Sequence, residues 1–286
     1  MGIGSARIWN VADRSLPSVV RTMPTATGGV LAIALSPDGR SLVGGGQDGS
    51  VLRWELPSTV LADNLSRVHS IALSPDRRWL ATGVGEATVR LWDLSDPERP
   101  VRTGPLDIGA RSFTPNAMAF SPDGRTLATH GGESALRLWD VSDTGAVELL
   151  STVAQRSGYT SAVAISPDGS LLVAGDSDDT LGFYDIRDRA RPVRLPDPPA
   201  GHSAYITAAL FTRDGDRLVT TSSDGTARLW DVTDPQRIAP VGEPHDFGAG
   251  QIFAAALSPD DRVLAVAGTD NTIRSGTGPV RRRRPP

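Results

Sequence analysis

Short β-rich runs separated by tight turns follow one another along this chain, and residues 204–241 show the pattern most clearly. Residues 204–211 are apolar and rich in β-forming side chains, 218–221 form a second short run, 226–230 alternate, and 237–241 form a fourth run. Turns with glycine after aspartate separate the first three runs. This pattern predicts four short antiparallel strands.

The same unit recurs along the chain. A Ser-Pro-Asp-type turn begins at six positions, with intervals of 38, 47, 45, 46 and 46 residues: Ser36, Ser74, Ser121, Ser166, Thr212 and Ser258. An aromatic residue near the end of each third strand recurs in step with this turn: Trp9, Trp54, Trp92, Trp139, Tyr184 and Trp230. Two linked periods of this length indicate one supersecondary unit copied along the chain.

A single four-stranded unit has two apolar faces and needs a neighbour on each of them. Arranging the units around an axis buries both faces and leaves only short sheet edges. A helical fold is excluded, because no segment keeps an apolar stripe at helical spacing for ten or more residues. The 30 glycines and 22 prolines also interrupt every stretch.

Specific motifs identify a family at this point. Arg-Leu-Trp-Asp ends the third predicted strand at residues 90–93, 137–140 and 228–231, and a Gly-His pair stands at residues 201–202. These motifs resemble those of the WD-repeat β-propellers, and the resemblance covers about the whole chain. It implies an all-β propeller of four-stranded antiparallel blades, with six blades as the prediction and an incomplete seven-bladed ring as the alternative.

The two ends of the chain carry incomplete units. Residues 4–10 align with residues 225–231, so the N-terminus supplies a third and a fourth strand. The C-terminus supplies a first strand, a second strand and the start of a third, and we expect the strand pattern to stop after Arg274. The ring would then be closed by strands from both ends, although the chain could instead be a fragment of a longer propeller protein. We predict one domain over residues 1–275 and a disordered Arg/Pro-rich tail over 276–286.

The resemblance also implies a buried hydrogen-bond network. In the family, an aspartate in the turn before the Trp accepts from the Trp, from a Ser or Thr hydroxyl and from the Gly-His imidazole. Only the unit that ends at Trp230 has every member, with His202, Asp224 and a hydroxyl at Thr220 or Ser222. We therefore predict a structural network of four residues: His202, Ser222, Asp224 and Trp230.

Composition restricts the chemistry that is available. The chain has no cysteine and no lysine, which excludes disulfides, thiolate chemistry, phosphate-loop lysines and Schiff-base lysines. No stretch approaches 18 apolar residues and no secretory pattern opens the chain, so we expect a cytoplasmic protein without a membrane partner. The abundance of Ala, Gly, Asp and Pro together with the absence of lysine indicates a bacterial source.

Motifs that suggest ligands are better explained by turns. Residues 44–49 fit Gly-x-Gly-x-x-Gly, but a strand follows them where a dinucleotide site needs a helix. Asp176, Asp178 and Asp179 lie in a predicted hairpin turn without the spacing of a calcium loop. We predict no catalytic residue, metal or cofactor. The alternative is a propeller enzyme that acts on a small molecule with a metal at the axis.

The resemblance implies a non-catalytic protein-interaction scaffold or a regulatory sensor, with loops on the top face holding a protein or peptide partner. Candidate contacts lie at or just before the first strands: Arg67, Phe113, Tyr159, Tyr205, Gln251 and Phe253. The net charge of −4 argues against nucleic acid, although the arginine run at 281–284 keeps that alternative open. We expect the isolated ring to be a monomer.

Overall fold

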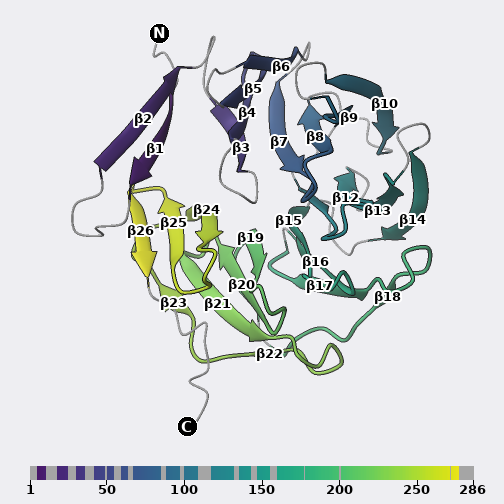
Figure 1. The fold of residues 1–286 in the computed structure, drawn as a ribbon. Coiled ribbons are helices and arrows are strands. Elements are labelled where there is room, and N and C mark those ends of the chain that lie inside the picture. Colours follow the sequence, from purple (N-terminus) through teal and green to yellow (C-terminus); the bar gives the residue numbers. More distant parts are fainter. Residues whose placement is uncertain are drawn as a thin grey trace. The chain divides into compact units, whose positions relative to one another are not determined.

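The computed structural model of the protein describes sixteen segments of the chain: residues 5–10, 18–24, 30–35, 42–48, 50–54, 59–63, 67–84, 88–96, 100–108, 117–131, 135–142, 147–154, 160–176, 178–199, 201–270 and 272–276. The regular elements in these segments are all β-strands (Figure 1). Their contacts divide the chain into two compact units, residues 1–115 and residues 116–286. Each unit is described by itself.

The first unit holds a two-stranded sheet and two four-stranded sheets. Its strands are β1 (Ser5–Asn10), β2 (Ser18–Pro24), β3 (Val30–Leu35), β4 (Leu42–Gly46), β5 (Ser50–Trp54), β6 (Thr59–Asp63), β7 (Val68–Leu73), β8 (Trp79–Val84), β9 (Thr88–Asp93) and β10 (Val101–Asp107). In each sheet, neighbouring strands are consecutive in sequence and antiparallel. This is the hairpin series that the alternating pattern predicted.

The second unit holds four sheets built in the same way. Its strands are β11 (Met118–Phe120), β12 (Thr126–Gly131), β13 (Ala135–Asp140), β14 (Glu148–Ala154), β15 (Thr160–Ile165), β16 (Leu171–Asp176), β17 (Leu181–Asp185), β18 (Val193–Arg194), β19 (Ile206–Phe211), β20 (Arg217–Ser222), β21 (Thr226–Asp231), β22 (Ala239–Pro240), β23 (His245–Asp246), β24 (Ile252–Leu257), β25 (Leu264–Gly268) and β26 (Ile273–Gly276). The first strands of successive sheets lie side by side, with contacts from β11 to β15, from β15 to β19 and from β19 to β24.

The repeated Ser-Pro-Asp phrase forms a hydrogen-bonded turn between the first and second strands. In the turn at Ser121, the hydroxyl donates to Asp123 Oδ1 at 2.5 Å and accepts the Thr126 N–H at 2.9 Å. The Asp123 carboxylate also accepts the Arg125 N–H at 3.1 Å. The turns at Ser74, Ser166, Thr212 and Ser258 repeat this arrangement. The phrase recurs because the hydroxyl and carboxylate satisfy backbone groups that the turn leaves unpaired.

The core lies between neighbouring sheets. Leu181 and Phe183 of β17 pack with Ile206, Leu218 and Trp230 of the next sheet. Similar clusters join the β11–β14 sheet to the β15–β18 sheet, and the β19–β23 sheet to the β24–β26 sheet. The prediction that each sheet covers the apolar face of its neighbour is therefore confirmed within the units. Burial of this area supplies about 25 cal/mol for each Å² removed from water.

Two details differ from the sequence expectations. The fourth strand predicted over residues 237–241 is shortened to β22, and β23 adds a second short pairing with β21. The Val241 N–H still donates to the Leu229 carbonyl at 2.7 Å, one residue beyond β22. The expectation that the last strand stops after Arg274 is wrong, because β26 continues to Gly276, which pairs with Leu264 and lies near Phe247.

The predicted N-terminal pair of strands is confirmed by β1 and β2, which form a sheet of their own. Strands β24 to β26 form a three-stranded sheet. Closure of a ring by strands from both ends stays a prediction. The tail from residue 277 onward lies outside the described residues.

Candidate functional site

The first strands of the second unit all begin at the same end of their sheets, which we call the entry end. There the second strand of each sheet ends and the third begins: Ile206, at the start of β19, pairs with Ser222, at the end of β20. Ile252 and Gly268 have the same relation in the next sheet. Loops at this end connect one sheet to the next and are free to carry binding residues.

Three predicted contact residues lie toward the entry end of two adjacent sheets. Tyr205 precedes β19 and is 56% exposed, Gln251 precedes β24 and is exposed, and Phe253 in β24 is 59% exposed. Their backbones are held in place, since the Tyr205 carbonyl accepts the Ser223 N–H and the Gln251 carbonyl accepts the Thr269 N–H. The side chains therefore stand outside the core on a fixed framework.

The remaining predicted contact residues are Arg67, Phe113 and Tyr159. Arg67 immediately precedes β7 in the first unit and is exposed. Phe113 and Tyr159 lie outside the described residues.

A buried chain of hydrogen bonds lies behind Tyr205 in the same sheet. The Trp230 N–H donates to Thr220 Oγ1 at 2.8 Å, and this hydroxyl lies 2.8 Å from His202 Nε2. The other imidazole nitrogen, Nδ1, lies 3.0 Å from Asp224 Oδ2. A neutral imidazole with its proton on Nδ1 satisfies every donor and acceptor, because Nε2 then accepts from Thr220.

The pKa shifts of His202 and Asp224 agree with a neutral imidazole beside an ionised carboxylate. Burial lowers the pKa of His202, although the Asp224 carboxylate opposes the shift. Burial alone would raise the pKa of Asp224, but hydrogen bonds from the Thr226 hydroxyl and from the Ser203 and Thr226 N–H groups lower it to about 2. The network thus pairs a neutral histidine with an ionised carboxylate, and it fixes the loop that leads to Tyr205.

The network departs from the sequence expectation in two residues. The Trp230 N–H bonds to the Thr220 hydroxyl rather than to Asp224, because the hydroxyl stands between them. Ser222 does not join the indole to the imidazole. Its hydroxyl accepts the Asp224 N–H at 3.0 Å and donates to the Ala204 carbonyl at 2.9 Å, so that it shapes the turn.

The Trp–Thr pair recurs in two other sheets. The indole N–H groups of Trp92 and Trp139 donate to Thr82 and Thr129 at 3.1 and 2.9 Å. Tyr184 stands at the same place in its sheet, and its hydroxyl accepts from Arg194 Nη1 at 2.9 Å. A threonine stands ten residues before Trp92, Trp139 and Trp230 in the sequence, and this spacing could have identified the indole acceptor in those three sheets. Before Trp54 the residue at this place is Gly44.

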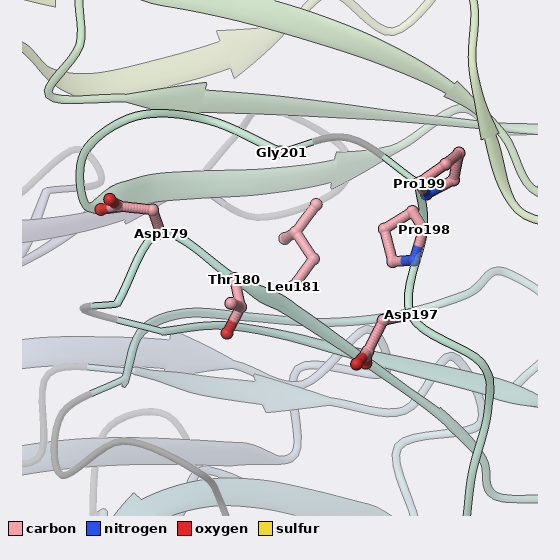
Figure 2. Close-up of a pocket in the computed structure, with 7 residues that line it drawn as sticks. All are labelled: Asp179, Thr180, Leu181, Asp197, Pro198, Pro199 and Gly201. Carbon is pink, nitrogen blue, oxygen red and sulfur yellow. The ribbon is translucent and has the colours of Figure 1, made fainter.

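A pocket that the sequence did not indicate lies at the entry end of the β15–β18 sheet, beside its connection to β19. It has a volume of about 190 Å³ and is lined by residues from the β16–β17 turn, the start of β17 and the connection to β19: Asp179, Thr180, Leu181, Asp197, Pro198, Pro199 and Gly201 (Figure 2). The sequence assigned Asp179 to a turn, which the structure confirms. The pairing of this turn with a proline-rich connection depends on the packing of two sheets.

The described residues contain no group of three or more His, Asp or Glu side chains placed to hold a metal ion. In the same part of the chain, we find no helix with the length and apolar character needed to span a bilayer.

Comparisons with known proteins agree with this architecture. The family model described as "WD domain, G-beta repeat" matches six segments: residues 17–55, 57–93, 108–140, 148–185, 198–231 and 241–275. A solved structure entitled "Crystal Structure of Mitotic Checkpoint Complex" contains a similar chain, with a TM-score of 0.79 and 20% sequence identity over 96% of this chain and 84% of that one. No curated protein matches. The predicted all-β fold of six blades is confirmed.

Proposed function

The chain belongs to the WD-repeat family, and on this premise we propose that it is a non-catalytic scaffold or sensor whose entry end holds a protein or peptide partner. WD40 propellers are generally non-catalytic scaffolds that bind proteins. Such a scaffold works by holding loops in a fixed geometry, and no chemical step is required of it.

One observation carries the proposal: Tyr205 and Phe253 are more than half exposed on adjacent sheets of one compact unit. Large aromatic side chains in water lose favourable burial, and aromatic residues are enriched in the centres of protein interfaces. The buried network from Trp230 to Asp224 fixes the backbone on which Tyr205 stands. The surface is therefore preorganised, which reduces the entropy lost on binding.

The similar solved chain supports a protein partner, since its title describes a complex. At 20% identity the likeness concerns the fold, so the partner of this chain has to be found by experiment. We also propose that the chain acts in the cytoplasm, as a monomer in a bacterial signalling pathway and without nucleic acid. Light scattering on the purified chain would test the monomer, and a dimer would contradict it.

Affinity capture with the full chain, followed by mass spectrometry, identifies the partner, and titration calorimetry then measures variants. We expect Tyr205→Ala and Phe253→Ala each to weaken binding about tenfold, as for residues at the centre of an interface. Val193→Ala is the matched control, because Val193 is 60% exposed but lies on the outer strand β18. Unchanged affinity in the Tyr205→Ala, Phe253→Ala double variant would overturn the proposal.

A further inference from the structure

The pocket beside Leu181 combines an apolar lining with acidic side chains. Leu181 is only 3% exposed and belongs to the core between the two sheets. Figure 2 shows Leu181 in the middle of the lining, with Asp179 on one side and Asp197 and Pro198 on the other. A ligand here would meet the two proline rings and the accessible edge of Leu181, with Asp179 and Asp197 at the margins.

The charges around the pocket are unbalanced. Asp179 and Asp197 are the charged residues among those described in the lining, and Arg194 donates to Asp197 Oδ1 at 2.8 Å. Nearby His202 stays neutral at neutral pH, since burial lowers its pKa. The described part of the pocket wall therefore carries a negative field, and field lines concentrate in such concave sites.

The size of the pocket selects the kind of occupant. Its volume of about 190 Å³ is below the range of about 300–1,000 Å³ that is typical of small-molecule sites. One long side chain of a bound polypeptide fits this description better than a cofactor. An aliphatic stem would cover Leu181 and the proline rings, and a cationic head would reach the carboxylates.

We propose that the partner of the entry end places an arginine side chain in this pocket, between Asp179 and Asp197 and against Leu181 and Pro198. Arginine is chosen because its planar group presents five N–H donors in a rigid fork that matches the geometry of a carboxylate. The inference rests on the proposed function and adds the chemistry of the partner to it.

A peptide array tests the inference with the full chain in solution. Short peptides of randomised sequence carry arginine, citrulline, lysine or leucine at one fixed position. Citrulline keeps the shape of arginine but has no charge. We expect arginine peptides to bind about tenfold more tightly than their citrulline counterparts, as a charge-assisted hydrogen bond predicts, and lysine peptides to lie between them.

Variants of the chain locate the effect. The double variant Asp179→Asn, Asp197→Asn should remove the preference for arginine. Asparagine tolerates the positive φ of 69° at Asp179, so the turn is retained, and thermal melting checks that the fold survives the loss of the Arg194 pair. Asp216→Asn is the matched control, since Asp216 is an exposed carboxylate at the opposite end of the β19–β20 hairpin.

The outcomes separate this inference from the proposed function. The arginine pocket would be overturned if arginine peptides bound no better than citrulline peptides or no better than lysine peptides. It would also be overturned if Asp216→Asn reduced the preference for arginine as much as the double variant does. If any of these occurs while Tyr205→Ala still weakens the captured partner, the pocket fails and the proposed function stands. An arginine preference that persists in a folded double variant would place the arginine site elsewhere and overturn the inference.

Discussion

The sheets that end in Trp139 and Trp230 place the same indole at the same point but support it differently. Trp139 pairs with Leu127 and Trp230 pairs with Leu218, and each N–H donates to a threonine ten residues earlier. Trp230 is fully buried, whereas Trp139 is 5% exposed. The Trp230 sheet continues the chain of bonds through His202 to Asp224.

The two sheets share the indole–threonine pair, and they differ in the histidine and aspartate that extend it around Trp230. Burial of an aromatic residue between two sheets and one hydroxyl acceptor are common to these two sheets. The β15–β18 sheet keeps only the first of these features, since Tyr184 takes the place of the Trp. The imidazole and carboxylate are found around Trp230, where the loop leading to Tyr205 begins. A fully satisfied buried network rigidifies its surroundings, which suits a loop that presents binding residues.

The two histidines of these sheets show the same contrast. His202 is bonded through both nitrogens. His130, at the end of β12, is buried, and its Nε2 has no hydrogen-bond partner in the described part of the chain. Burial and the nearby Arg137 lower the pKa of His130 to about 4. One buried imidazole therefore belongs to a network, and the other is held neutral by its surroundings.

The largest expected effect comes from removing the better-supported indole. Trp230→Ala should lower the free energy of unfolding by about 3–5 kcal/mol, because it leaves a cavity between two sheets. Trp139→Ala should cost somewhat less, since Trp139 is 5% exposed whereas Trp230 is fully buried. Chemical denaturation of both variants measures the difference, and an unchanged stability of Trp230→Ala would contradict its assignment as a buried anchor.

The next effect tests the network itself. Thr220→Val removes the acceptor of the Trp230 N–H and the partner of His202, so we expect a loss of about 2–3 kcal/mol. Thr129→Val removes the acceptor of the Trp139 N–H and should cost about 1–2 kcal/mol. Equal losses in the two denaturation curves would show that the histidine and aspartate add nothing.

The dependence of stability on pH distinguishes the two kinds of buried group. The folded pKa of His130 is below its ordinary value of 6.5, so its contribution is complete above pH 6.5 and is lost as the pH falls toward 4. The folded pKa of Asp224 is about 2 against an ordinary 3.8, so its contribution is lost only below pH 3.8. Each is worth about 1–2 kcal/mol after screening.

His130→Thr isolates the first of these effects. It gives the β12 sheet the residue that the β20 sheet has at this place, Thr221, nine residues before the Trp. Denaturation between pH 4 and pH 7 should show a flatter profile than the parent chain. A profile that keeps the parent slope would mean that another group titrates in this range.

The smallest expected effect concerns the repeated turn. The fourth residue of the turn has a positive φ of 76° at Gly215 and 70° at Gly124. Arg77 stands at the same place with a φ of 64°, although it is not a glycine. Arg77→Gly should raise stability by about 0.5–1 kcal/mol, whereas Gly215→Ala should lower it by about 1–2 kcal/mol. Thermal melts compare the two, and a destabilised Arg77→Gly variant would show that contacts of the arginine outweigh the backbone strain.

Much of the architecture was readable from local pattern. The Ser-Pro-Asp turns, the alternating third strands and the spacing of the Trp residues predicted the sheets, their order and their mutual covering, because each of these features depends on residues close together in sequence. The residues of the network around Trp230 were also visible, except that Thr220 rather than Ser222 bridges the indole and the imidazole.

The remaining features depended on tertiary structure. Thr220 and Ser222 both carry a hydroxyl, and the direction of each side chain decides which of them accepts from Trp230. Packing decides which of the candidate contact residues are exposed to solvent, as Tyr205 and Phe253 are. The pocket beside Leu181 joins a turn of one sheet to the Pro198–Pro199 connection of the next. Repeat periodicity predicts that sheets meet, but the shape of the space between them is set by how particular side chains pack there.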